Sequence, residues 1–151
     1  MSAPRRRACS RDFPGTVEAA SDAENWVARE ARAMGLGGDA EFAIPLCIEE
    51  LFLNAVQHGR ANRASVSVCA QSDGVVVEFA DDGEPFDPTC APVKRIGGRT
   101  RDFDIGGYGA ALMKQFSRRM TYRHAEGLNR LVVEFDAGRG AGERPETLGV
   151  P

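Results

Sequence analysis

The chain has 151 residues, of which 42% are hydrophobic and 27% charged, as in a soluble globular protein with one domain. Its net charge of -3 gives no global attraction to nucleic acid or anionic membranes. No apolar run approaches the roughly 18 residues that span a bilayer, and the four cysteines form no CxxC pair. We therefore expect a cytoplasmic protein with reduced thiols and no zinc site, membrane anchor or nucleic-acid partner.

The first third of the chain predicts a strand followed by two helices. Residues 1–8 form a basic, disordered N-terminus, and Arg11-Asp12-Phe13-Pro14 reads as a short strand. Thr16 or Ser21 can cap a helix that runs to Met34, with Val17 on its core face. Asp39 is a candidate N-cap for the next helix. Pro45 predicts that this helix either starts near Ile44 or bends there, and Gly59 ends it.

The remaining elements are mostly strands. Residues 64–70 and 75–80 alternate or are β-branched around a Ser-Asp-Gly turn, which predicts a β-hairpin. A long irregular segment, 82–105, precedes a helix over 110–119, and a loop of that length is usually functional. Two further strands, 120–124 and 130–135, end the domain 9–136, and the Gly- and Pro-rich segment 137–151 reads as a flexible tail.

This order of elements predicts the fold class. The sequence β-α-α-β-β-α-β-β, dominated by hairpins, favours an α+β fold: a two-layer α/β sandwich with a mostly antiparallel mixed sheet and helices on one face.

Three constellations carry chemistry. Glu50 and Asn54 stand four residues apart on an otherwise apolar helix, hence on one face. A carboxylate and an amide oxygen there suit a magnesium nucleotide and a proton transfer, although an internally paired or solvated face is the plainer reading. Asp81-Asp82-Gly83 ends an apolar strand, where a carboxylate can accept from an exocyclic amine, or form a simple turn.

The third constellation is Gly106-Gly107-Tyr108-Gly109, which leads into a helix. Backbone N–H groups and the helix dipole make such a turn a phosphate site, whereas a flexible hinge is the alternative. It is not a Walker A loop, because the Gly-Lys-Ser/Thr of that motif is absent.

In this order and context, the three constellations resemble the GHKL (Bergerat-fold) ATPase superfamily. Within it, the chain is most similar to bacterial anti-sigma-factor serine/threonine kinases over about residues 10–136. The stretch from Glu50 to Gly59 matches the N box, the Asp-x-Gly at 81–83 matches the adenine box, and 107–109 match the glycine box at the end of the lid.

The resemblance implies a role for each matched residue. Glu50 is the expected general base, and Asn54 the ligand of Mg²⁺ that bridges the phosphates. Asp81 is expected to bind the adenine amine, with Gly83 permitting close approach. The backbone of Gly106, Gly107, Tyr108, Gly109 and Ala110 is expected to bind phosphate, and His58 is a candidate for lining the pocket.

The resemblance also assigns an ATP lid to the chain, and the chain departs from the family pattern at two positions. Residues 87–105 correspond to the ATP lid, where Arg95, Arg99 and Arg101 are candidates for neutralising phosphate. Pro85 replaces the second glycine of the adenine box, and Ala110 is smaller than usual, which puts the geometry of the lid in doubt.

The resemblance predicts a homodimeric kinase that uses ATP and Mg²⁺. Its expected partners are a STAS-type antagonist, which it phosphorylates, and a sigma factor or similar target, which it sequesters by partner switching. The alternative is an ATP-binding interaction module without catalysis. A purely structural domain that has lost ATP fits poorly, because all three boxes are present.

Overall fold

The computed structural model describes residues 8–89 and 108–136. The predictions for residues 1–7 of the basic N-terminus, the lid arginines, Gly106, Gly107 and the C-terminal tail therefore lie outside the described residues.

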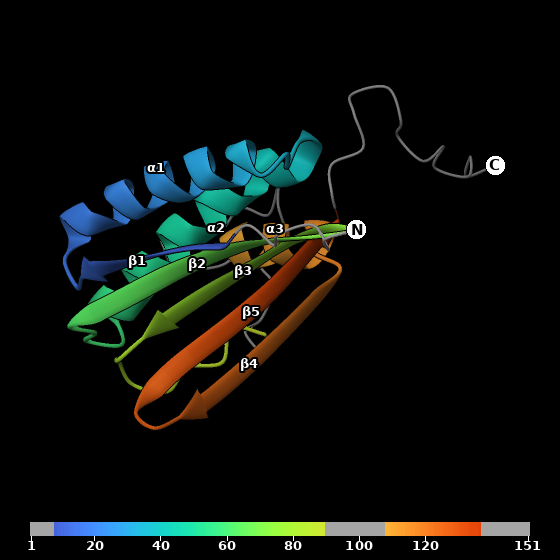
Figure 1. Cartoon of the computed structure of the whole chain (residues 1–151). Coiled ribbons are helices and arrows are strands. Elements are labelled where there is room, and N and C mark those ends of the chain that lie inside the picture. The colour runs from blue at the N-terminus through green and yellow to red at the C-terminus, as the bar shows by residue number, and fades with distance from the viewer. Residues whose placement is uncertain (1–7, 90–107, 137–151) are drawn as a thin grey trace, which may run out of the picture.

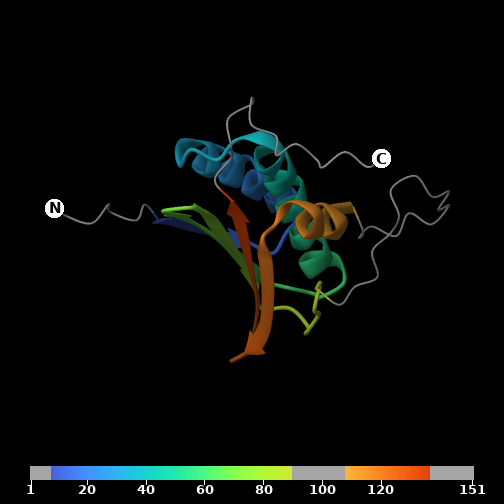
Figure 2. The same ribbon diagram turned by 90° about the vertical axis from the view of Figure 1, so that its right-hand side faces the viewer.

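The described residues form a sheet with helices on one of its faces (Figures 1 and 2). The sheet has five strands in the order β1-β2-β3-β5-β4, and every pairing is antiparallel. The predicted α+β sandwich and the predicted order of elements are thus confirmed. The elements are β1 Ala8–Pro14, α1 Val17–Ala33, α2 Gly38–Gln57, β2 Arg63–Gln71, β3 Gly74–Asp81, α3 Tyr108–Phe116, β4 Arg119–Ala125 and β5 Leu128–Asp136.

Helix α1 begins as the sequence predicts, but α2 does not. The Thr16 hydroxyl accepts a hydrogen bond from the Ala19 amide at 3.3 Å and so caps α1. The N-cap of α2 is Gly37 rather than Asp39, and Pro45 lies inside the helix. A start near Ile44 is therefore wrong. Buried side chains on both sides of Pro45 hold the helix together, since tertiary packing outweighs one missing backbone hydrogen bond.

Helix α3 ends three residues earlier than expected, at Phe116 instead of Arg119. The Ser117 amide still donates to the Met113 carbonyl, but the Arg118 amide donates to the Glu134 carbonyl at 2.7 Å. The chain is already pairing with β5 at that point, so the helix cannot continue.

The core lies between the sheet and the helices and centres on aromatic rings. Phe52 of α2 meets Phe13 of β1 and Phe79 of β3 edge to face, at centroid distances of 6.0 and 6.1 Å. Val17, expected on the core face of α1, is 47% exposed, because it is the first residue of the helix and lies beyond the packed part of that face.

The cysteines follow the strand and helix periodicity. Cys47 is buried in α2, whereas Cys69 is only partly buried. Cys69 alternates with the buried Val66 and Val68 of β2, so it belongs to the sheet face that the helices leave open.

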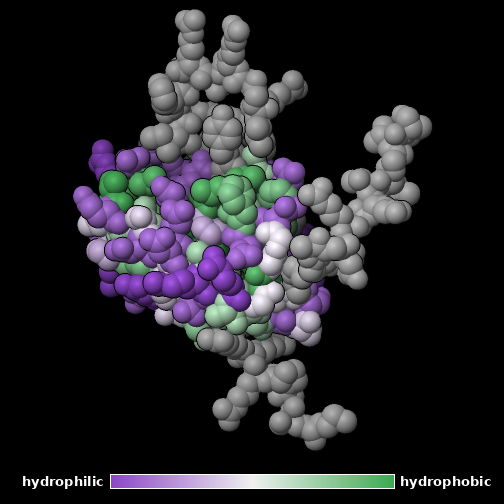
Figure 3. Space-filling model, turned by 90° about the horizontal axis from the view of Figure 1, so that it is seen from above, coloured by the Kyte–Doolittle hydropathy of each residue, from purple (hydrophilic) through white to green (hydrophobic). Residues whose placement is uncertain are grey.

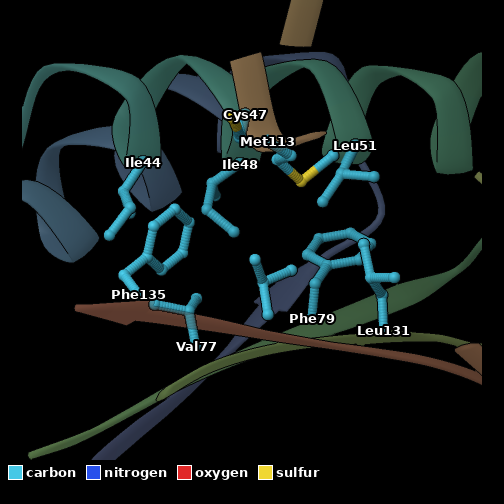
Figure 4. Close-up of a pocket in the computed structure, with 10 residues that line it drawn as sticks. Ile44, Cys47, Ile48, Leu51, Val77, Phe79, Met113, Leu131 and Phe135 are labelled. Carbon is cyan, nitrogen blue, oxygen red and sulfur yellow. The ribbon is translucent and has the colours of Figure 1, made fainter. Parts of the chain in front are cut away.

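A small gap remains between α2, α3 and the sheet (Figure 4). Its volume is about 10 Å³, roughly what one water occupies, and its lining is apolar. Ile44, Ile48 and Leu51 point into it from α2, opposite Phe79 and Leu131 of the strands. It is an imperfection in core packing and has no room for a nucleotide.

Two phenylalanines of α2 provide a matched test of this core. Phe52 is fully buried and Phe42 is 69% exposed. Phe52→Ala should lower the free energy of unfolding by about 3–5 kcal/mol, since it deletes a ring from the aromatic cluster. Phe42→Ala should change it by less than about 0.5 kcal/mol. Urea unfolding measures both, and equal losses would contradict the assigned core.

Candidate functional site

Asn54 carries an unsatisfied polar atom on α2. Its side-chain Oδ1 is buried and has no hydrogen-bond partner among the described residues, where it is the sole such side-chain atom. Burying an amide oxygen without a partner costs about 1–3 kcal/mol, so folding alone does not explain it. Such an oxygen is a suitable ligand for a hard cation, which makes Asn54 a fitting ligand for Mg²⁺.

The protein itself does not build a complete metal cage in the described residues, where no three His, Cys, Asp or Glu side chains cluster. This fits Mg²⁺, which commonly takes one or two protein ligands and completes its shell with substrate phosphates and water.

Glu50 lies one helical turn before Asn54 on α2 and is half-buried. Burial, and then the negative charge of Glu50, raise the pKa of the Cys47 thiol to about 12. Cys47 is therefore a neutral core thiol rather than a nucleophile. The helix face thus presents a carboxylate beside an amide oxygen, with an inert thiol next to them.

Asp81 is a buried carboxylate at the last position of β3. It is 8% exposed, and its Oδ1 accepts from the Gly83 amide at 2.9 Å and from Asn129 Nδ2 at 3.1 Å. Burial raises the pKa of Asp81, and the hydrogen bonds from Asn129 and Gly83 partly offset that rise. The carboxylate is held in place by donors yet is costly to ionise.

The turn after β3 is fastened to the end of α2. The Glu84 amide donates to the Gly59 carbonyl at 2.8 Å. A Cβ on Gly83 would lie 2.8 Å from that same carbonyl oxygen and 2.9 Å from Asp81 Oδ1, so only glycine fits there. The helix with Glu50 and Asn54 and the strand with Asp81 are therefore joined at the ends that carry the site.

The two neighbouring aspartates have different roles. Asp82 Oδ1 accepts from the backbone amides of Asn62 and Arg63, at 2.7 and 3.0 Å. These hydrogen bonds lower the pKa of Asp82, and the one from the Arg63 amide contributes most. Asp82 thus ties its turn to the start of β2, and Asp81 is the carboxylate left for a ligand.

The sequence analysis missed Asn129 and Tyr122 as residues of this site. Asn129 of β5 is 6% exposed and contacts Asp81, and the Tyr122 hydroxyl of β4 donates to Asn129 Oδ1 at 2.5 Å. A signal was present: Asn129 occupies an inward position in the alternation of Leu131, Val133 and Phe135. A polar side chain at such a position is expensive unless it is paired.

The other predicted site residues are placed less fully. His58 is exposed and is the C-cap of α2, so its proposed place in the pocket stays a prediction. Tyr108, Gly109 and Ala110 form the first turn of α3, which packs against α2. Their predicted role, backbone binding of phosphate, also stays a prediction. No described helix is long and apolar enough to cross a membrane.

Fold and site together define a class of protein: a single-sheet ATPase domain in which a helix with Glu and Asn adjoins a strand that ends in Asp-x-Gly. The chain belongs to the histidine kinase-like ATPase domain family, whose model matches residues 13–135. It is also similar to serine/threonine-protein kinase BtrW of Bordetella bronchiseptica, with 27% identity over 122 residues, which cover 78% of this chain and 86% of that protein.

The two aspartates predict opposite effects of pH on stability. Because the pKa of folded Asp81 lies above its ordinary value of 3.8, ionising it costs stability once the pH exceeds that value. Asp81→Asn should therefore raise the melting temperature at pH 7, and the gain should fade towards pH 3.

Asp82→Asn is the matched control. The pKa of folded Asp82 is lowered, so its charge stabilises the protein above pH 3.8 and that contribution is lost as the pH falls. This variant should melt below the wild type at pH 7, and the deficit should vanish in acid. Thermal unfolding followed by circular dichroism measures both, and a destabilised Asp81→Asn at pH 7 would refute the assignment.

Proposed function

We propose that this protein is an ATP-dependent serine/threonine protein kinase that acts as an anti-sigma-factor-type regulator. The observation that carries the proposal is the unpartnered, buried amide oxygen of Asn54 one turn from the Glu50 carboxylate, on a helix joined to the strand of Asp81. Membership of an ATPase family and the similarity to a protein named as a serine/threonine kinase support it.

In the proposed complex the residues divide the work of binding. The adenine amine of ATP donates to Asp81. Asn54 Oδ1, together with phosphate oxygens, holds Mg²⁺, which supplies neutralising charge to the phosphates. The backbone of residues 106–110 and an arginine of the segment that resembles the ATP lid are proposed to bind the phosphates.

The proposed reaction is a transfer of the γ-phosphoryl group. Glu50 accepts the proton of a serine or threonine hydroxyl while that oxygen bonds to the γ-phosphorus. The bond from phosphorus to the bridging oxygen breaks, and ADP leaves. The acceptor we propose is a STAS-type antagonist. The sequestered partner is a sigma factor or similar regulator, bound by a homodimer as the family resemblance implies.

Glu50→Gln tests the proposed base. It should leave the Kd for Mg-ATP within about threefold and slow phosphorylation by roughly a hundredfold or more. The control is Glu49→Gln, its neighbour on α2, which interacts with Glu24 instead. Burial, then a side-chain hydrogen bond with Glu49 and the charge of Glu49, raise the pKa of Glu24. Transfer from labelled ATP to STAS-domain proteins of the same genome is the assay. An unimpaired Glu50→Gln would exclude Glu50 as the base, and nucleotide binding by the wild type without transfer would favour the non-catalytic module.

Asn54→Ala tests the proposed metal ligand. The Kd for ATP should rise about tenfold or more with Mg²⁺ present and change little with chelator, because only the metal-bridged contact is lost. The ligand-free variant should melt no lower than the wild type, since an unpaired buried oxygen has been removed. Calorimetric titration with and without Mg²⁺ measures this, and equal losses under both conditions would contradict the role.

A further inference from the structure

Asn129 sits at the centre of a buried hydrogen-bond cluster. Its Nδ2 lies 3.1 Å from Asp81 Oδ1, 3.2 Å from the Gly83 carbonyl oxygen and 2.9 Å from the Glu84 carbonyl oxygen, and shares its two hydrogens among these three acceptors. All three partners are acceptors only, so the nitrogen end of the amide must face them. The oxygen end then faces the Tyr122 hydroxyl, which must donate. The orientation of the Asn129 amide therefore follows from chemistry alone.

This orientation fixes the two oxygens of Asp81 in different roles. Within the described part of the chain, the hydrogen bonds to the carboxylate all end on Oδ1, and their donors are the Gly83 amide and Asn129 Nδ2. Oδ1 is the inner atom and must be an acceptor. Oδ2 is left as the atom that can accept from a ligand.

Strand register holds the cluster in place. Asp81 pairs with Asn129 across β3 and β5, so both side chains lie on one face of the sheet. Tyr122 of β4 pairs with Leu131 of β5, whose side chain lies on the same face of the sheet. A tyrosine hydroxyl is protonated at neutral pH, and burial raises the pKa of Tyr122 further, so this hydroxyl can donate to Asn129. Three neighbouring strands thus contribute to the orientation of one carboxylate.

We propose that Asn129 and Tyr122 are positioning residues for base recognition: Asn129, itself held by Tyr122, donates to Asp81 Oδ1 and so directs Oδ2 of the carboxylate toward the 6-amino group of an adenine base. The proposal rests on the proposed binding of ATP. A purine with an amino group at position 6 can donate a hydrogen bond to Asp81 Oδ2, the outward oxygen. A ligand with an oxo group there places two acceptors face to face and is rejected.

The lock makes an unusual prediction for Asp81→Asn. Because both inner donors require an oxygen, the new amide must keep its oxygen inward and turn its NH₂ group outward. The outward atom becomes a donor and should now prefer inosine triphosphate, whose 6-oxo group accepts. We expect the wild type to bind ATP tighter than ITP by roughly tenfold to a hundredfold, and Asp81→Asn to reverse the order.

The double variants separate locking from mere support of the fold. In Asp81→Asn with Asn129→Leu, only the Gly83 amide still requires an oxygen on the inner side, so the new amide is held less firmly and the preference for ITP should weaken. Tyr122→Phe in the same Asp81→Asn background keeps Asn129 and its acceptors but removes the hydroxyl that holds the Asn129 oxygen, and should reduce the preference less than Asn129→Leu does. It is the milder change should the Leu variant not fold. Calorimetric titrations with both nucleotides, on proteins whose melting is cooperative, give these values.

The outcomes are distinguishable from failure of the proposed function. If the wild type binds ATP tightly and Asp81→Asn still prefers ATP, the lock is overturned while ATP binding stands. The same holds if the reversed preference is as strong in both double variants as in Asp81→Asn alone. If the wild type binds neither nucleotide, the proposed function fails and base specificity fails with it. Reversal in Asp81→Asn and its weakening in the double variants would establish the positioning role.

Discussion

The candidate site depends on one junction, where the turn after β3 meets the end of α2. The Gly59 carbonyl accepts the Glu84 amide at 2.8 Å, and Gly83 comes so close to it that a Cβ would collide. This contact links the helix that carries Glu50 and Asn54 to the strand that carries Asp81. Without it, the groups proposed to hold the two ends of ATP would belong to separately mobile elements, and their spacing would not be set.

The β4–β5 hairpin completes this arrangement from the opposite side. Asn129 binds the carbonyls of Gly83 and Glu84, and Tyr122 binds Asn129. The turn after β3 is thus held on both sides. Its Glu84 amide donates to the Gly59 carbonyl at the end of α2, and its Gly83 and Glu84 carbonyls accept from Asn129 of β5. A turn fastened at both sides allows the buried carboxylate beside it to keep a single orientation, which is what selective recognition of a base requires.

Sequence periodicity predicted the elements better than their ends. The hairpin of β2 and β3 was predictable because alternation and an Asp-Gly turn agree. The end of α3 was not, because it depends on the Arg118 amide pairing with Glu134 of a strand that comes later in the chain. Pro45 left the start of α2 undecided for the same reason: the buried residues around it, and not local propensity, decide that α2 is continuous.

The site was predictable where residues act through local spacing. Glu50 and Asn54 share a helix, and Asp81 and Gly83 share a turn, so short motifs reveal them. Spacing alone does not show that Asp82, unlike Asp81, accepts hydrogen bonds from the backbone amides of Asn62 and Arg63. Asn129 lies 48 residues from Asp81, and only strand pairing brings them together. Contacts of this kind follow from sheet register, which no single stretch of sequence encodes.

The energetics of the free protein point to the same residues as the geometry. The unpaired Asn54 oxygen and the buried charge of Asp81 both oppose folding, although most of the described core is well packed. Asp82, a carboxylate one position away, shows that the chain can place such a group where folding favours its charge. Groups that oppose folding are retained when a ligand uses them. Here one is an oxygen suited to a cation and the other an acceptor suited to an amine, and a magnesium complex of an adenine nucleotide satisfies both at once.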